Sequence, residues 1–336
     1  MVLSRRRILV AGAGGFIGQY LVTRLKADGH WVRGADIRPP TAGKTAADDF
    51  QLLDLRRADA CLHACEGGID WVFQLAADMG GIGYITGSHA AIARNNTLIN
   101  AHMLEAARQH DVKLFLFSSS ACVYAQSKQR NSEPAPLKED DAYPADPEAG
   151  YGWEKLYAEE LCKYYRQDYG LDTSVVRFHN VYGPLSDYEG GREKAPAAIC
   201  RKIALATDGG EIEIWGDGNQ SRSFLYIDDC VEGLVRLVAG HDERPVNLGS
   251  SESLTVNQLT DLIANIAGKR IVKRYSLDRP QGVRGRNSDN SRLLSLVGWQ
   301  PAVSLREGLT LTYRWIEAEL RKANRLPRSQ PTAAAR

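Results

Sequence analysis

A glycine-rich turn near the N-terminus constrains the fold of this chain more than any other feature. Gly12, Gly15 and Gly18 follow the apolar run RILVA and precede a segment whose apolar residues recur with helical spacing. Glycines allow the backbone to turn tightly and to approach a pyrophosphate, whose charge is stabilised by a helix N-terminus. Because the turn joins a strand to a helix, it predicts a dinucleotide-binding site that includes Phe16 and Ile17.

The next strand-like run ends in an acidic residue, Asp36, eighteen residues beyond the last glycine. Its carboxylate is placed to accept hydrogen bonds from an adenosine ribose and would repel a 2′-phosphate. We therefore expect NAD rather than NADP, and the nearby Arg38 is the feature that argues the other way. Further cofactor contacts are expected at Asp54, Leu55 and Ala76, where the following strands end.

Apolar runs with strand character alternate with helical segments through the first half of the chain. The runs cover 5–11, 31–36, 50–54, 70–76 and 112–118, and a helix at 151–169 followed by a strand at 173–178 extends the pattern. Such alternation predicts an α/β fold of the Rossmann type with a doubly wound parallel sheet. In that architecture ligands bind beyond the carboxyl ends of the strands.

The pattern loosens after residue 180 into loops rich in Gly and Pro, short strands and further helices. This change predicts a smaller α/β C-terminal domain that binds the substrate. We assign residues 1–179 to an NAD-binding domain, to which 223–250 partly returns, and 180–323 to the interleaved substrate-binding domain. Residues 324–336 have no periodicity and are rich in Arg, Pro, Ala and Ser, which predicts a disordered tail.

The charge balance argues against two classes of partner. With 42 basic and 41 acidic side chains the net charge is +1, so neither nucleic-acid binding nor attraction to a membrane surface is expected. The chain has neither a long apolar run nor a signal-peptide pattern, which favours a cytoplasmic protein. Its six scattered cysteines are expected to be reduced. Cys61 and Cys65 are interpreted as buried helix residues rather than metal ligands, and no metal site is expected.

Tyr151 and Lys155 are four residues apart and would project from one face of a helix. A lysine ammonium beside a phenol favours the phenolate, which brings the tyrosine closer to acting as a general base near neutral pH. That base could remove a hydroxyl proton while the carbinol hydride leaves to a nicotinamide. Such a pair is common on surface helices, but its place after the glycine turn and after the serines 118–120 favours a catalytic role.

Together these motifs resemble the extended short-chain dehydrogenases/reductases, the superfamily of nucleotide-sugar epimerases and dehydratases, over nearly the whole chain. Cys122 stands where 4-epimerases of the superfamily have a threonine and 4,6-dehydratases have a carboxylate. Ala125 departs from the proline that commonly follows, and the loop 126–136 is particular to this chain. Several segments are similar to the GDP-mannose 3,5-epimerases: 77–83, 120–122, 190–196, 215–218 with 220–223, and 282–290.

The resemblance implies that Cys122 and Lys194 exchange protons at C3 and C5 of GDP-mannose. The products would be GDP-L-galactose and, by inversion at C5 alone, GDP-L-gulose. Tyr151 and Lys155, with Ser120, would run a transient oxidation at C4 with NAD. This scheme suits the residue types, because hydrogens at C3 and C5 become acidic only when C4 is a carbonyl, and inversion needs a base on one face and an acid on the other.

The resemblance also implies a set of contacts with the sugar nucleotide and a homodimer formed through helices near 88–109 and 151–169. The expected substrate contacts are Gly80, Ser120, Ala121, Cys122, Asn180, Glu193, Lys194, Ala195, Lys202, Gln220, Arg222 and Arg286. Guanidinium groups among them suit phosphate oxygens.

Several alternatives stay open from the residues alone. Cys122 could be an inert buried thiol, Lys194 part of a solvated loop, and the arginines structural pairs. The enzyme could be a 4-epimerase or a 4,6-dehydratase on another nucleotide sugar, and a non-catalytic NAD(H)-binding module is the alternative from another class. The base of the nucleotide, the product ratio and which of Cys122 and Lys194 acts as base are likewise open.

Overall fold

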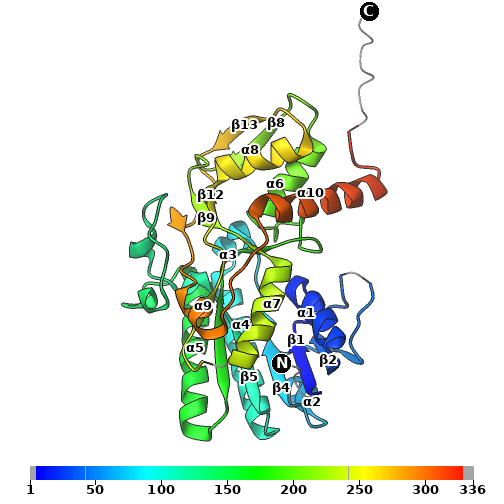
Figure 1. Ribbon diagram of the computed structural model, residues 1–336, viewed down its shortest axis with the longest axis vertical. Helices are drawn as coiled ribbons and strands as arrows, with labels where there is room; N and C mark the ends of the chain where they lie inside the picture. The colour runs from blue at the N-terminus through cyan, green and yellow to red at the C-terminus, as the bar shows by residue number, and fades with distance from the viewer. Residues whose placement is uncertain (1–4, 42, 241, 328–336) are drawn as a thin grey trace, which may run out of the picture.

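A seven-stranded parallel sheet forms the larger body of the protein (Figure 1), in a computed structural model that describes residues 5–41, 43–240 and 242–327. The strand order is β11-β6-β5-β4-β1-β2-β3. The bounds are β1 Arg7–Ala11, β2 Trp31–Asp36, β3 Asp49–Leu52, β4 Trp71–Gln74, β5 Leu114–Ser120, β6 Thr173–Phe178 and β11 Val246–Leu248. The predicted fold class, a doubly wound α/β fold, is confirmed.

The strand order reverses between β1 and β4, which lie side by side at the centre of the sheet. Ile8 of β1 pairs with Val32 of β2 on one side and with Trp71 of β4 on the other. The connections therefore leave the carboxyl ends of β1 and β4 in opposite directions, and this opens the crevice in which such sheets bind their ligands.

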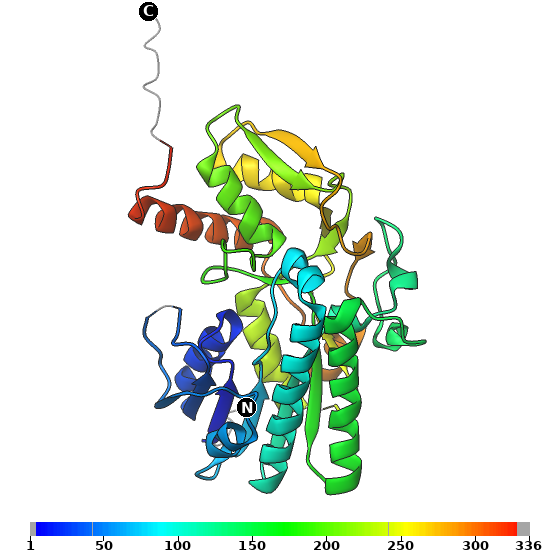
Figure 2. The same ribbon diagram turned by 180° about the vertical axis from the view of Figure 1, so that it is seen from behind.

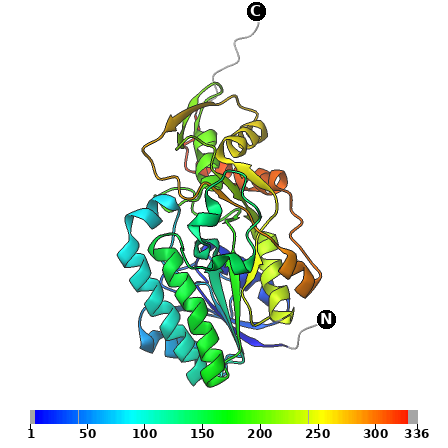
Figure 3. The ribbon, with the colours of Figure 1, turned by 90° about the vertical axis from the view of Figure 1, so that its left-hand side faces the viewer.

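Helices cover both faces of the sheet (Figure 3) because the strands carry apolar side chains on both sides. On one face Ile8 and Val10 pack with α1 (Phe16–Ala27) and α7 (Ile227–Gly240). On the other, Leu9 and Ala11 pack with α2 (Ala58–Cys65), α4 (His89–Gln109) and α5 (Ala149–Tyr169). As expected, Cys61 and Cys65 are buried on α2.

A smaller body lies over the carboxyl ends of the strands (Figure 2). Its helices are α6 (Ala195–Leu205), α8 (Val256–Ala267) and α10 (Leu305–Lys322), and α9 (Ser291–Val297) packs back against β11. Its strands form two small sheets, β8 (Glu211–Trp215) with β13 (Val272–Ser276), and β9 (Ser221–Ser223) between β12 (Ser253–Thr255) and β14 (Gly285–Arg286). A further short pair joins β7 (Val181–Tyr182) to β10 (Leu225–Tyr226).

The start of the segment predicted to be a disordered tail contacts the smaller body. Arg325 forms an ion pair with Glu189 at 2.6 Å, and Leu326 packs against the core. Residues 328–336 of that segment lie outside the described residues. Within the described ranges, no helix combines the length and the apolar character needed to cross a bilayer.

Candidate active site

The glycine turn is packed so closely that larger residues would not fit at two of its positions. Gly12 has φ +84°, and a Cβ built on it would lie 2.8 Å from the backbone nitrogen of Ala76. A Cβ on Gly18 would lie 2.1 Å from the carbonyl oxygen of Gly12. Gly15 is the N-cap of α1, and no described side chain caps this helix start. The free N–H groups of the first turn therefore suit a pyrophosphate.

Asp36 lies against this turn at the end of β2. Its Oδ2 accepts a hydrogen bond from the Gly14 N–H at 2.9 Å, and its Oδ1 accepts one from the Arg38 N–H at 3.0 Å. The carboxylate is thus fixed beside the glycine turn by two backbone donors. A fixed acceptor at this strand end suits the ribose hydroxyls of a dinucleotide.

The other predicted cofactor residues lie around the same edge of the sheet. Phe16 and Ile17 open α1 and are half-buried, and Leu55 is buried after β3. Asp54 forms an ion pair with Arg56 at 2.6 Å, and the hydrogen bonds and charge of that guanidinium hold the pKa of the Asp54 carboxyl below its usual value. Asp54 is therefore ionised in the structure.

The start of α5 lies directly against the turn that follows β5. This 3₁₀ turn covers Ala121–Val123, and the Ser120 hydroxyl accepts a hydrogen bond from the Cys122 N–H at 3.2 Å. A Cβ built on Gly152 would lie only 2.3 Å from the Cys122 carbonyl oxygen, so glycine is needed for the observed approach. This approach brings Tyr151, the preceding residue on α5, beside Cys122.

Tyr151 and Lys155 lie together on α5. The Lys155 Nζ is 5.7 Å from the centroid of the Tyr151 ring and donates a hydrogen bond to the Ser118 carbonyl at 3.0 Å. Burial, followed by electrostatic interactions with Cys122 and Glu154, raises the pKa of Tyr151 well above its usual value. Burial also lowers the pKa of Lys155. Burial of Tyr151 therefore acts on its pKa in the direction opposite to the one expected from a neighbouring ammonium.

A buried charge cluster surrounds the Cys122 thiol. The Arg286 Nη1 lies 3.5 Å from the Cys122 Sγ, while its Nη2 donates to Glu148 at 2.8 Å and its Nε donates to Gln129 at 2.6 Å. Burial alone would raise the pKa of Glu148, but the charges of Arg286 and Arg222 and a hydrogen bond from the Cys122 thiol bring it below its usual value. Glu148 is therefore an ionised carboxylate that holds Arg286 beside the thiol.

Lys194 lies at the start of the smaller body's first helix. It is the N-cap of α6, where burial lowers the pKa of its ammonium and the electrostatic interaction with Cys122 acts in the opposite direction. Among the described residues, none accepts a hydrogen bond from the Lys194 Nζ. Cys122 is consequently the common electrostatic neighbour of Tyr151, Lys155, Lys194 and Arg286.

Three of the predicted substrate residues make contacts within the smaller body and its connections. The Lys202 Nζ donates to the Glu213 carbonyl at 2.7 Å, and the Asn180 side chain donates to the Ser223 carbonyl at 2.9 Å. The Gln220 amide donates to the Trp215 carbonyl at 2.9 Å, whereas its Oε1 is buried with no partner among the described residues. Of these three described residues, Gln220 is thus the one with a buried side-chain oxygen that is free to accept a hydrogen bond.

The remaining predicted substrate residues lie nearer to the Cys122 cluster. Arg222 donates to the Val283 carbonyl at 2.7 Å, and burial followed by the charge of Arg286 lowers the pKa of Arg222 to about 10. Glu193 forms an ion pair with Arg201 at 3.3 Å. Ala121 is buried in the turn after β5, Ala195 opens α6 in an exposed position, and Gly80 packs against the Tyr84 side chain.

Two members of the cluster, Glu148 and Gln129, were not among the predicted site residues. Gln129 lies in the loop that is particular to this chain, where no sequence motif marks it. Glu148 is the N-cap residue of α5 and precedes the predicted catalytic helix directly. An acidic residue at that position was the one available signal, since carboxylates are favoured at helix N-termini.

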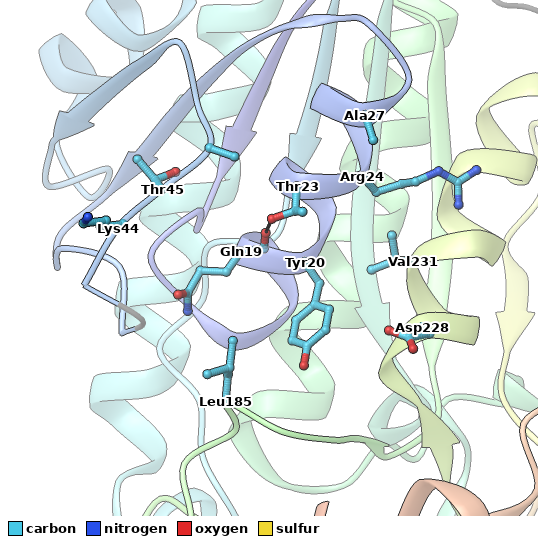
Figure 4. Close-up of a pocket in the computed structure, with 11 residues that line it drawn as sticks. Gln19, Tyr20, Thr23, Arg24, Ala27, Lys44, Thr45, Leu185, Asp228 and Val231 are labelled. Atoms are coloured by element: carbon cyan, nitrogen blue, oxygen red, sulfur yellow. Dashed lines mark hydrogen bonds between the residues drawn. The ribbon is translucent and has the colours of Figure 1, made fainter. Parts of the chain in front are cut away.

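A separate groove of about 560 Å³ lies on the outer side of α1 (Figure 4). Tyr20 and Arg24 of α1, Thr45 of the loop after β2, Leu185, and Asp228 of α7 contribute to its walls. None of the cluster residues around Cys122 lines it. The groove is therefore distinct from the crevice in which the predicted catalytic residues meet.

Comparison with known proteins gives a consistent set of relatives. Residues 8–249 match the model of the NAD dependent epimerase/dehydratase family. The chain is 46% identical over 318 residues to GDP-mannose 3,5-epimerase of Arabidopsis thaliana, covering 94% of this chain and 83% of that protein. It is also 46% identical to GDP-mannose 3,5-epimerase 1 of Oryza sativa subsp. japonica, covering 95% of this chain and 84% of that protein.

Solved structures of related epimerases share the fold over most of the chain. UDP-glucose 4-epimerase of Thermotoga maritima with UDP-glucose superposes with a TM-score of 0.85 at 28% identity, covering 94% of this chain and 99% of that one. UDP-glucuronic acid 4-epimerase of Bacillus cereus with UDP-glucuronic acid and NAD superposes with a TM-score of 0.81 at 26% identity, covering 93% and 99%.

Proposed function

We propose, because the chain belongs to the NAD dependent epimerase/dehydratase family, that it is an NAD-dependent enzyme that inverts C3 and C5 of GDP-mannose. The observation that carries this proposal is the position of Cys122, which packs with Tyr151 at the start of α5 and lies 3.5 Å from the Arg286 guanidinium. A thiol beside the predicted redox tyrosine and a fixed positive charge supports the proposed proton exchange. The 46% identity to named GDP-mannose 3,5-epimerases supports the choice of substrate.

NAD suits the crevice, because the glycine turn leaves a free helix start and Asp36 offers a fixed acceptor beside it. The glycine turn and Asp36 would hold NAD, which would supply a reversible hydride acceptor for C4 of the sugar. Tyr151 as phenolate would take the proton of the C4 hydroxyl group during oxidation, and as phenol it would give that proton back during reduction. Lys155 would support this exchange from the next turn of α5, where its Nζ is held by Ser118.

The inversion itself needs two groups on opposite faces of the sugar ring. Cys122 as thiolate would remove the proton at C5 or C3, because the neighbouring C4 carbonyl delocalises the charge that forms. The guanidinium of Arg286, held by Glu148 and Gln129, would stabilise that thiolate. Lys194 would deliver a proton to the other face, since its ammonium has no competing acceptor among the described residues.

The decisive experiment incubates the enzyme with GDP-mannose in deuterated water and locates the label by NMR. We expect deuterium at C3 and C5 without net formation of NADH, and GDP-L-galactose and GDP-L-gulose as products. Cys122→Ala should suppress the exchange by a factor of about 100 or more while nucleotide binding changes much less. Inversion at C4 without label at C3 or C5 would replace this function with 4-epimerisation.

Two rival functions make different predictions in the same experiment. A 4,6-dehydratase would lose the C6 hydroxyl, and Cys122 argues against it because such enzymes are expected to have a carboxylate at this position. A non-catalytic NAD(H)-binding module would leave the sugar unchanged. The presence of Tyr151 and Lys155 together on α5, with Cys122 packed against Tyr151, favours catalysis over binding alone.

The enzyme would act as a homodimer through α4 and α5, which pack side by side on one outer face of the sheet (Figures 2 and 3). This pair of helices exposes large apolar side chains: Leu98 is 37% exposed, Trp153 54%, Tyr157 54% and Tyr164 46%. Exposed apolar side chains that cluster on one face are typical of an interface.

Light scattering after gel filtration would test the homodimer. We expect Tyr157→Glu to halve the molar mass, because a charge in an apolar interface is costly. Leu277→Glu is the matched control, since Leu277 is 68% exposed but lies in the smaller body. An unchanged molar mass for Tyr157→Glu would exclude this face as the dimer interface.

A cytoplasmic location stays a prediction that fractionation of the source cells would test.

A further inference from the structure

The geometry points to Asp78 and Arg192 as a positioning pair that fixes Lys194 at the start of α6 for the proton-transfer steps. This inference rests on the proposed function and adds two residues to its machinery that sequence reasoning did not assign. Neither would touch the reacting atoms. Their role would be to fix the loop that ends in Lys194.

Arg192 ties that loop to the segment after β4 by several contacts. Its Nη1 lies 3.2 Å from the Asp78 Oδ1 and donates to the Met79 carbonyl at 3.2 Å, and its Nη2 donates to the Tyr84 hydroxyl at 2.7 Å. The guanidinium also stacks over the Tyr84 ring at 4.0 Å. Arginine is suited to this arrangement, because a lysine could not form the same fork.

The backbones of the two segments approach each other closely as well. The Gly81 N–H donates to the Arg192 carbonyl at 2.9 Å. A Cβ built on Gly81 would lie 2.2 Å from the carbonyl oxygen of Glu193, the residue before Lys194. Because no described residue accepts a hydrogen bond from the Lys194 ammonium, the place of that ammonium depends on these backbone anchors.

Residues 78–81 after β4, the anchor segment of the Lys194 loop, are in turn fixed to α5, the helix that carries Tyr151 and Lys155. The Asp78 N–H donates to the Asn96 Oδ1 at 2.6 Å, and the Asn96 amide donates to the Asp78 carbonyl at 3.1 Å and to Glu154 at 2.8 Å. Glu154 directly precedes Lys155 on α5. Asn96 of α4 therefore binds both the anchor segment and α5, and this fixes the Lys194 loop relative to Tyr151 and Lys155.

The Asp78 carboxylate is ionised in this setting. Burial alone would raise its pKa, but hydrogen bonds from Asn95 and Tyr84 and the charge of Arg192 bring the pKa of Asp78 below its usual value. Asp78→Asn would replace one acceptor oxygen by an NH₂ group that faces other donors. The substitution leaves the backbone contacts with Asn96 in place, so it weakens the pair without removing the anchor segment.

The test separates the two half-reactions in the holoenzyme with its bound NAD. Fluorescence of enzyme-bound NADH, after mixing with GDP-mannose, reports oxidation at C4. Deuterium at C3 and C5 of the recovered sugar nucleotide reports proton transfer. We expect Asp78→Asn and Arg192→Lys to keep the NADH signal and to lower deuterium incorporation about 100-fold, the size of effect that a misplaced group of about 1 Å produces.

Gly81→Ala perturbs the same loop without changing any charge, because its new Cβ must displace the Glu193 carbonyl. Gly81→Ala should likewise keep the NADH fluorescence and lower the deuterium incorporation. Arg166→Lys is the matched control, because Arg166 also binds a carbonyl oxygen and a carboxylate. It donates to the Thr173 carbonyl at 3.1 Å and lies 3.5 Å from Glu243, but it belongs to the C-terminal half of α5. We expect this control to lose neither signal.

Equal loss of both signals in the three variants, or loss of neither, would overturn the inference. A wild-type enzyme that incorporates no deuterium at C3 or C5 would instead refute the proposed function, and the positioning role with it. Thermal unfolding of each variant identifies a folding defect. If Asp78→Asn fails to fold, Arg192→Lys and Gly81→Ala still decide the question, because Arg192 lies on the Lys194 loop itself and a Cβ at position 81 displaces that loop directly.

Discussion

Gly152→Ala adds one methyl group to α5, and this group should push the helix away from the turn at Ala121–Val123 that carries Cys122. The new Cβ would lie 2.3 Å from the Cys122 carbonyl oxygen and 3.0 Å from the Pro147 Cβ, whereas ordinary contact begins at 3.4 Å. The shortfall of about 1 Å has to be met by movement of α5 or of the turn, because the contacted oxygen belongs to the backbone. Overpacking of this kind costs about 1–3 kcal/mol of unfolding free energy.

The effect on catalysis should exceed the effect on stability. Tyr151 and Cys122 would move apart by about 1 Å, and displacements of this size lower rates about 100-fold. Deuterium incorporation at C3 and C5 measures the rate, and urea unfolding measures the stability. Gly87→Ala is the control, since its new Cβ meets nothing within 4 Å. A Gly152→Ala enzyme with wild-type exchange would refute the argument that this close approach sets the geometry of the site.

Two further predictions concern charged groups. Arg286→Lys keeps a positive charge but cannot bind Gln129 and Glu148 at once, so we expect deuterium exchange to fall about tenfold or more; an unchanged rate would remove Arg286 from the mechanism. His179 is fully buried, and burial lowers its pKa from 6.5 to about 3. The unfolded chain therefore binds a proton that the folded one does not, so stability should fall as the pH drops from 6.5 toward 3. Calorimetry over this range should show that the unfolding free energy of His179→Gln depends less on pH than that of the wild type. An identical pH dependence of the two proteins would show that His179 does not cause the loss of stability.

The parts of the site that the sequence predicts are those with local causes. The glycine turn is recognisable because a strand, a turn and a helix follow one another directly, and Tyr151 and Lys155 because they are one helical turn apart. Parallel strands bring their carboxyl ends to one edge, so residues that end separate strands meet without any sequence signal of contact. The fold class follows from the same periodicity.

The charge cluster could not be derived in this way. Arg286 and Cys122 are 164 residues apart, and the guanidinium lies beside the thiol only because β14 pairs with β9 in the smaller body. Glu148 and Gln129 enter the cluster through loop conformations, for which no periodicity exists. The extent of Tyr151 burial, which raises its pKa, likewise has no local sequence signal, because burial is a property of the packed structure.

The interleaving of the two bodies limits how such enzymes can be recombined. The polypeptide leaves the large sheet after β6, supplies Lys194, returns to add β11, and leaves again before it supplies Arg286. A chimaera made with a single junction after β6 would join a sheet lacking its own edge strand to a foreign set of acid/base partners. Exchange of the whole smaller body between relatives therefore calls for three junctions, one after β6 and one on each side of β11, so that the edge strand stays with the sheet it completes.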